Sequence, residues 1–176
     1  QIIKLNTFIS SKWQDLIAVA FSDDIVQEAL IGTSSRSYGK LIHKILSEIE
    51  STEDITNAIY FLTISGMLDI KNIKIIEDTI INVVSHPDLQ KFFDPGQVIK
   101  NETEIMLSNG EVVRPDRVVI QNDVLTIIDY KTGEEKKQDY DQMKKYYEAF
   151  SGLGYKEIAT KIVYICDIIR VVDGLR

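Results

Sequence analysis

The chain has 176 residues, of which 44% are hydrophobic, and its 20 basic and 27 acidic residues give a net charge of −7. This length and composition fit one compact domain, so we predict a single domain over residues 1–176. The acidic balance argues against a free-standing nucleic-acid coat protein, because such proteins bind by neutralising phosphates. It leaves open an enzyme that holds cations at its site.

Cys166 is the only cysteine, so the chain can form neither an internal disulfide nor a cysteine-ligated cluster. This usage fits a reducing compartment. No apolar run reaches the roughly 18 residues of a membrane span, and we expect no contact with a membrane. No glycine has the spacing of a Walker-type phosphate loop. Because the chain begins with Gln1, we interpret it as a fragment of a longer protein, and any ATP-driven motor would lie outside it.

Residues 1–96 are predicted to be mainly helical. Apolar residues between Trp13 and Ala20 indicate an amphipathic start, and a clearer helix runs from Ser37 or Tyr38 to Glu50. Its core-facing positions share the spacing of one helical face; they are Leu41, Ile42, Ile45, Leu46 and Ile49.

Two more helices follow in this half. Asp54 is predicted to cap a helix that Gly66 ends, and Asp69 to cap a helix that closes before His86-Pro87. Residues 88–93 predict one further short helical turn.

Residues 97–176 are predicted to form the sheet core with one helix. Asn109-Gly110 is a strong hairpin signal, and Asn122-Asp123 is a second turn. The predicted strands cover residues 97–107, 112–120, 124–131, 161–165 and 168–172. The helix covers residues 137–150 and ends at Gly152 and Gly154.

The segments around Asp116 and Asp129 carry the strongest chemical signal. A two-residue turn at Asn122-Asp123 would place Asp116 opposite Asp129, with Cβ atoms roughly 5 Å apart; a three-residue turn would shift this pairing by one. Pro115 should break the ladder beside Asp116, and Lys131 shares a face with Asp129. Two carboxylates beside an ammonium suit metal-dependent phosphodiester hydrolysis. The alternative is a strand end with ordinary surface charges.

Other polar residues are weaker candidates. His43 lies beside the apolar stripe of its helix, as a structural or solvated histidine or as a metal ligand, and Gly39 one turn earlier leaves room for close approach. Glu102 and Glu104 alternate on a predicted strand and point the same way, so one of them could be a further ligand or a group that orients a ligand.

Gln142 and Tyr146 share a helix face outside the Tyr140–Met143–Tyr147 stripe. They form either a mixed polar surface or a hydrogen-bonding pair that faces the site or a DNA strand. His86, which precedes a proline at a helix end, is interpreted as structural.

Taken together in chain order, these residues resemble the C-terminal nuclease domain of the RecB and AddA helicase-nucleases, within the PD-(D/E)xK superfamily. The lone cysteine separates the chain from the iron–sulfur members of that superfamily. The resemblance spans roughly residues 37–165, and the matching segments are Gly39-Lys40-Leu41-Ile42-His43-Lys44-Ile45-Leu46, Glu102, Arg114-Pro115-Asp116-Arg117-Val118, Asp129-Tyr130-Lys131-Thr132-Gly133 and Gln142-Met143-Lys144-Lys145-Tyr146.

The resemblance implies an α/β (α+β) fold with a restriction-endonuclease-like core, in which helices flank a mixed central sheet and the metal site lies at one end of the central strands. It implies metal ligation by His43, Asp116, Asp129 and the backbone carbonyl of Tyr130, with Glu102 as a less secure ligand. Lys131 would orient or deprotonate the attacking water. Gln142 and Tyr146 would position the substrate.

The implied activity is that of a DNA exonuclease that uses Mg²⁺, for which Mn²⁺ could substitute. The implied setting is recombination and repair in the bacterial cytoplasm, at the nucleoid, with helicase domains of the same polypeptide and a partner subunit. Two alternatives remain: a catalytically silent nuclease fold that binds DNA or docks a motor, and a stand-alone repair or defence nuclease.

Overall fold

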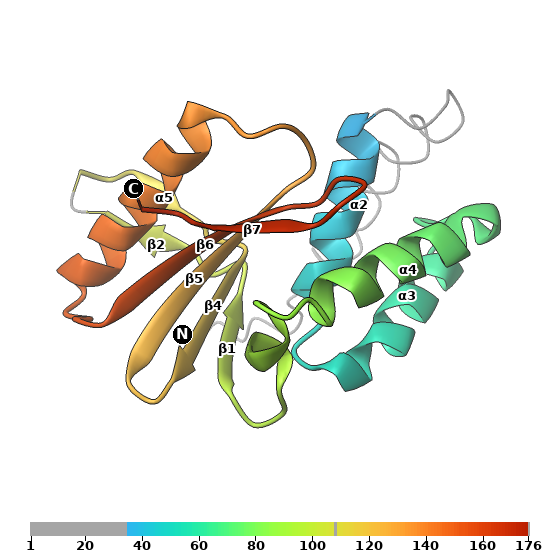
Figure 1. Ribbon diagram of the computed structural model, residues 1–176, viewed down its shortest axis with the longest axis horizontal. Coiled ribbons are helices and arrows are strands. Elements are labelled where there is room, and N and C mark those ends of the chain that lie inside the picture. The colour runs from blue at the N-terminus through green and yellow to red at the C-terminus, as the bar shows by residue number, and fades with distance from the viewer. Residues whose placement is uncertain (1–34, 108, 176) are drawn as a thin grey trace, which may run out of the picture.

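The computed structural model describes residues 35–107 and 109–175 (Figure 1). The helix predicted near Trp13 lies outside this range. The described part is a mixed α/β structure, which confirms the predicted fold class. Its central sheet has five strands in the order β1-β4-β5-β6-β7, and a separate two-stranded ribbon pairs β2 with β3. Within the described residues, no helix is both long and apolar enough to span a membrane.

The helical half forms a layer on one side of the sheet (Figure 1). It consists of α2 (Ser35–Ser47), α3 (Ile55–Ile64) and α4 (Ile73–Val84), joined by short 3₁₀ turns. The core residues predicted for the first helix are correct for Ile42, Ile45, Leu46 and Ile49, which are all buried. Helix α2 ends at Ser47, however, so Ile49 lies in the turn that follows it.

The two predicted N-caps have different outcomes. The Asp69 carboxylate accepts a hydrogen bond from the N–H of Lys71 and caps the 3₁₀ turn that leads into α4. The prediction for Asp54 is wrong, because its side chain does not cap α3. Asp54 instead accepts the N–H of Ser51 at 2.8 Å, which completes a capping box on the 3₁₀ turn before the helix.

The predicted first strand is split in two. It divides into β1 (Val98–Asn101) and β2 (Ile105–Met106), because Glu102 adopts a left-handed backbone with φ +51° that no regular strand accommodates. The second predicted strand is also split, into β3 (Val112–Val113) and β4 (Arg117–Gln121). This second break, around Pro115, confirms the predicted ladder interruption beside Asp116.

The β4–β5 hairpin has the predicted register. Asn122 and Asp123 both have positive φ, and Gln121 pairs with Val124 across this two-residue turn. Strand β5 (Val124–Lys131) has the predicted bounds. It is followed by α5 (Lys137–Gly152), which leads to β6 (Ile158–Tyr164) beside β5 and parallel to it. Strand β7 (Arg170–Asp173) closes the sheet in antiparallel pairing.

Successive residues of the central strands alternate between two cores, as the pleat of a sheet requires. Ile128 and Tyr130 of β5 pack in the core shared with α2, α3 and α4, which we call the α2 side. Ile127 of β5 packs with Met143 and Phe150 of α5 in the second core, which we call the α5 side. A site at the end of β5 can therefore receive side chains from both faces.

Candidate metal centre and active site

Asp116 lies at the centre of the site, directly before β4. Extending the pairing of Arg117 with Ile128 by one residue brings Asp116 level with Asp129, as predicted. The Asp116 carboxylate accepts the N–H of Tyr130 through Oδ2 at 2.7 Å. Because this bond fixes the carboxylate against the main chain of β5, Oδ1 is directed by the fold rather than by solvent.

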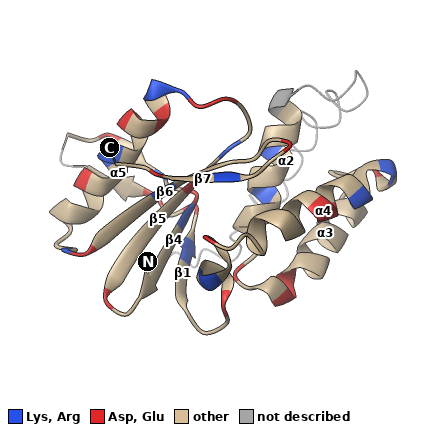
Figure 2. Ribbon diagram, in the orientation of Figure 1, with Lys and Arg blue, Asp and Glu red and all other residues tan. Residues whose placement is uncertain are grey.

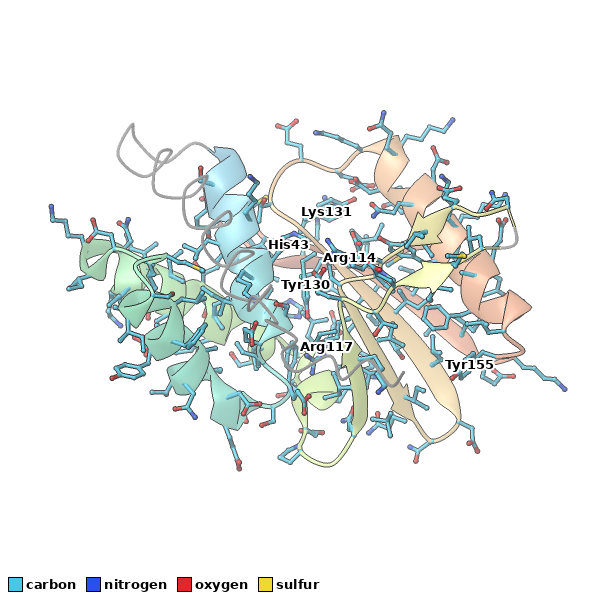
Figure 3. The ribbon with its side chains drawn as sticks, turned by 180° about the vertical axis from the view of Figure 1, so that it is seen from behind. His43, Arg114, Arg117, Tyr130, Lys131 and Tyr155 are labelled. Atoms are coloured by element: carbon cyan, nitrogen blue, oxygen red, sulfur yellow. The ribbon has the colours of Figure 1, made fainter. Side chains whose placement is uncertain are left out.

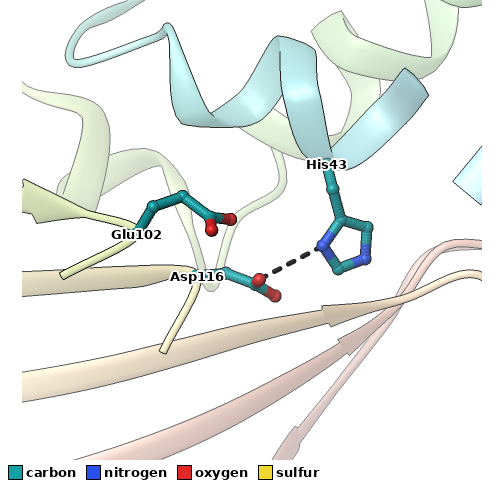
Figure 4. Close-up of side chains that lie close together, drawn as sticks. All are labelled: His43, Glu102 and Asp116. Atoms are coloured by element: carbon teal, nitrogen blue, oxygen red, sulfur yellow. Dashed lines mark hydrogen bonds and ion pairs between the residues drawn. The ribbon is translucent and has the colours of Figure 1, made fainter. Parts of the chain in front are cut away.

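His43 reaches Asp116 from α2. Its Nδ1 lies 3.1 Å from Oδ1 of Asp116 (Figure 4), and its ring meets the Tyr130 ring edge-on, with the centroids 6.3 Å apart. Gly39 permits this approach of the helix, because a Cβ at that position would lie 2.4 Å from Oγ1 of Thr132. The predicted close approach at Gly39 is therefore observed.

Glu102 completes a group of three side chains suited to a cation. One ligand atom each from His43, Glu102 and Asp116 lie within 4.8 Å of one another. The N–H of Glu102 donates to the carbonyl oxygen of Asp116 at 3.0 Å, which holds the left-handed turn. The Glu102 carboxylate also receives Nε of Arg114 at 2.9 Å. A nitrogen and two carboxylates form a donor set that binds divalent metals.

Asp129 and Lys131 lie beside this group on the α5 side. Oδ2 of Asp129 is 2.7 Å from Nζ of Lys131, and Lys131 also donates to Oε1 of Gln142 at 2.8 Å. Gln142 donates in turn to the hydroxyl of Tyr146, which donates to the carbonyl oxygen of Arg114 at 3.0 Å. A continuous hydrogen-bonded chain therefore runs from Asp129 to the loop before Asp116.

Two acids of the site have raised pKa values, first because they are buried and second because Asp116 is negatively charged. Burial, followed by the charge of Asp116, raises the pKa of Asp129 to about 6, although Lys131 opposes the shift. Burial and the charge of Asp116 also raise the pKa of Glu102. For His43, burial favours the neutral ring, but the hydrogen bond and charge of Asp116 outweigh it and raise the pKa. A bound cation would stabilise the charged form of carboxyl groups whose pKa is raised in this way.

The predicted residues divide into two connected groups. His43, Glu102 and Asp116 come together as a set of donors suited to a cation, and we call this candidate site the cation-binding group. Asp129, Lys131, Gln142 and Tyr146 form the hydrogen-bonded chain. Asp129 is thus held by Lys131 here, and its role as a metal ligand stays a prediction. The same holds for the Tyr130 carbonyl.

Three details of the sequence interpretation change. Glu104 is exposed and stands apart from the site, because the backbone turn at Glu102 ends the alternation that would have aligned the two acids. Tyr146 is only 3% exposed, so its ring belongs to the core of the α5 side and only its hydroxyl reaches the site. Arg114 had no predicted role, yet its side chain holds Glu102 and its carbonyl holds Tyr146.

Two grooves meet at Arg114. One, of about 680 Å³, lies over the cation-binding group, and Lys40 and Lys44 line it together with His43 and Asp116. The other, of about 400 Å³, is lined by Arg114, Gln142, Lys145 and Tyr146. Figure 2 shows basic residues along α2, the helix that carries Lys40 and Lys44. Positive side chains thus border a negatively charged centre, an arrangement suited to a phosphate that approaches a bound cation.

A larger groove, of about 820 Å³, lies between α4 and the segment that joins β6 to β7. His86, Cys166 and Asp167 line it, but it shares no residue with the cation-binding group. His86 accepts the N–H of Asp88 at 3.2 Å, in keeping with its predicted structural role. We therefore assign the candidate site to the groove of about 680 Å³, where His43, Glu102 and Asp116 converge.

Comparisons with known proteins do not add to this assignment. No protein-family model matches the chain, and no curated protein matches it in sequence. Among solved structures, the crystal structure of SSO0001 is 17% identical over 93% of this chain and 80% of that chain, with a TM-score of 0.36. A likeness of this size carries no argument about fold or function, so the site must be judged by its own geometry.

Proposed function

We propose that this chain is a metal-dependent DNA nuclease that hydrolyses phosphodiester bonds with Mg²⁺, for which Mn²⁺ can substitute. The observation that carries the proposal is the convergence of His43, Glu102 and Asp116 within 4.8 Å, directly beside the ion pair of Asp129 and Lys131. His43, Glu102 and Asp116 line an open groove, and the basic side chains of Lys40, Lys44 and Arg114 line it with them.

The cation-binding group has the chemistry that the reaction needs. His43, Glu102 and Asp116 would hold the divalent ion, which when bound polarises a phosphate and lowers the pKa of a coordinated water. The Tyr130 N–H fixes the Asp116 carboxylate, and Arg114 fixes that of Glu102. Ligands held in this way need little rearrangement to bind a cation.

Lys131 would supply the second catalytic element. Asp129 and Gln142 hold its ammonium from two directions, at 2.7 and 2.8 Å. An ammonium fixed at this point orients a water molecule and offsets the negative charge that develops on the phosphate. Gln142 and Tyr146 maintain the position of Lys131 and would face the substrate along the second groove.

The proposal extends to the setting of the enzyme. We propose an exonuclease module that works with the helicase domains of a longer polypeptide and a partner subunit, on DNA at the bacterial nucleoid, during recombination and repair. Contacts to the phosphate backbone would make cleavage independent of base sequence.

The decisive experiment is a cleavage assay on linear and circular DNA, with Mg²⁺ and with EDTA. We expect the chain to degrade linear DNA with Mg²⁺ and to lose all activity with EDTA. Lys131→Met should be inactive, while Lys161→Met, which removes a lysine paired with Asp173 on the far strands, should cleave at the wild-type rate. A wild-type chain that binds DNA and never cuts it would contradict the proposal and favour the catalytically silent alternative.

A further inference from the structure

Arg117 is a fully buried arginine whose two terminal nitrogens donate to main-chain oxygens, while its Nε has no partner among the described residues. Its guanidinium donates to the carbonyls of Ile49 and Glu50, both at 2.6 Å, and to that of Phe92 at 2.8 Å. It also stacks over the ring of Phe93 at 4.1 Å. Burial of this group lowers its pKa. Burying a guanidinium among neutral acceptors has a large desolvation cost, so stability alone does not require an arginine at this position.

Asn101 links the same set of groups. It is paired with Arg117 across β1 and β4, and its Oδ1 accepts Nη1 of Arg117 at 3.3 Å. Its Nδ2 donates to the carbonyls of Ser47 at 2.9 Å and Ile49 at 3.3 Å. Arg117 and Asn101 therefore join the end of α2, the end of β1 and the start of β4. We call this pair of side chains the brace.

Each of the three segments that the brace joins carries one member of the cation-binding group. Asp116 directly precedes Arg117, Glu102 directly follows Asn101, and His43 lies one helical turn before Ser47. The structure brings these members together from three segments that are far apart in the chain. Figure 3 shows His43, Tyr130 and Arg117 along the junction between α2 and the sheet.

We propose that Arg117 and Asn101 are positioning residues that set the spacing of His43, Glu102 and Asp116 for a divalent cation. The inference rests on the proposed function, because it assigns the brace to the same metal centre. A side chain that merely filled the core would stabilise the fold without fixing these three segments to one another. The brace fixes all three through directional hydrogen bonds, and a shift of one segment would open the donor set.

The test compares metal affinity with stability in Arg117→Lys, Asn101→Ala and a control, Ile80→Ala. Ile80 is fully buried in α4 and belongs to the core of the α2 side, but it takes no part in the brace. Calorimetric titration with Mn²⁺ and Mg²⁺, well below each melting temperature, gives the dissociation constants, and thermal unfolding gives the loss of stability. Removal of groups that orient metal ligands typically weakens binding about 10–100-fold. We expect losses of that size for the two brace variants and a change below about twofold for Ile80→Ala, even where it lowers stability as much.

The outcomes separate the two proposals. Wild-type affinity in folded Arg117→Lys and Asn101→Ala would overturn the brace and leave the metal centre intact. A wild-type chain that binds neither metal would overturn the metal centre, and the brace with it. If Arg117→Lys does not fold, Asn101→Ala decides the question, because its side chain is only half-buried and its removal leaves Arg117 bound to three carbonyls.

Discussion

On the α2 side of the sheet, the candidate metal ligands are brought together by contacts between segments far apart in the chain. On the α5 side, the groups that would act on the substrate follow the end of one strand and one helix face, and each is hydrogen bonded to the next. His43 and Asp116 are 73 positions apart, whereas Lys131 and Gln142 are 11 apart. Metal binding should therefore depend on long-range packing, and turnover on a local chain of polar side chains.

The largest expected effect comes from Asp116, because it belongs to the cation-binding group and its charge also acts on Asp129. Asp116→Asn removes the charge that His43 and a cation would share, so we expect metal affinity to fall at least about 100-fold and cleavage to become undetectable. Calorimetry and the DNA cleavage assay measure the two effects. Asp173→Asn, at an exposed carboxylate paired with Lys161, is the matched control and should leave both unchanged. Near-normal metal binding in Asp116→Asn would remove Asp116 from the centre.

Lys131→Met should separate the contribution of the α5 side to cleavage from that of the α2 side to metal binding. We expect cleavage to fall about 100- to 1,000-fold, the usual loss for a group that stabilises transition-state charge, while Mg²⁺ binding stays within about threefold of wild type. The cation-binding group keeps His43, Glu102 and Asp116 in this variant. Single-turnover cleavage at saturating Mg²⁺ distinguishes the two effects. A variant that loses metal binding as well would show that Lys131 is structural.

Gly39→Ala tests the packing of α2 against the sheet. The new methyl group would lie 2.4 Å from Oγ1 of Thr132, so either the helix or the threonine must move. We expect about 1–3 kcal/mol of destabilisation and a metal affinity several-fold weaker, because His43 lies one turn further along the same helix.

The double variant Gly39→Ala with Thr132→Ala should recover most of this loss, because it removes the clashing hydroxyl. Chemical denaturation and metal titration of both single variants and the double variant form a complete cycle. Additive losses in the double variant would show that the two residues do not interact.

The smallest effect is expected for Tyr146→Phe. The ring remains in the core, and the variant loses only the hydroxyl that joins Gln142 to the Arg114 carbonyl. We expect about 1 kcal/mol lower stability, a several-fold slower cleavage and unchanged metal affinity. Tyr147→Phe on the same helix is the control. Full activity in Tyr146→Phe would show that the part of the hydrogen-bonded chain needed for cleavage ends at Gln142.

Much of the local structure could be predicted because it depends on neighbouring residues. The Asn122-Asp123 turn, the break at Pro115 and the bounds of β5 all follow from preferences of residues close in sequence. The turn then fixes the register that brings Asp116 level with Asp129. The ion pair of Asp129 with Lys131 lies within this same predictable strand.

The brace and the backbone at Glu102 could not be predicted in this way. Arg117 binds carbonyl oxygens of residues as many as 68 positions away, and a carbonyl acceptor carries no residue-type signature. The sequence around Glu102 predicts a strand, whereas its left-handed conformation comes with a bond from its N–H to the carbonyl of Asp116, which is 14 positions away in the chain. Helical spacing places Tyr146 outside the Tyr140–Met143–Tyr147 stripe, but its ring is in the core of the α5 side and only its hydroxyl reaches the Arg114 carbonyl.

At Glu102, the left-handed backbone lowers the stability of the fold, while the carboxylate contributes to the candidate metal site. A residue with a Cβ at φ +51° raises the free energy of the native state by roughly 1 kcal/mol, and glycine would relieve that strain. A directed-evolution experiment that selects only for heat tolerance would therefore favour the replacement of Glu102. The more stable variants would lack one carboxylate of the donor set.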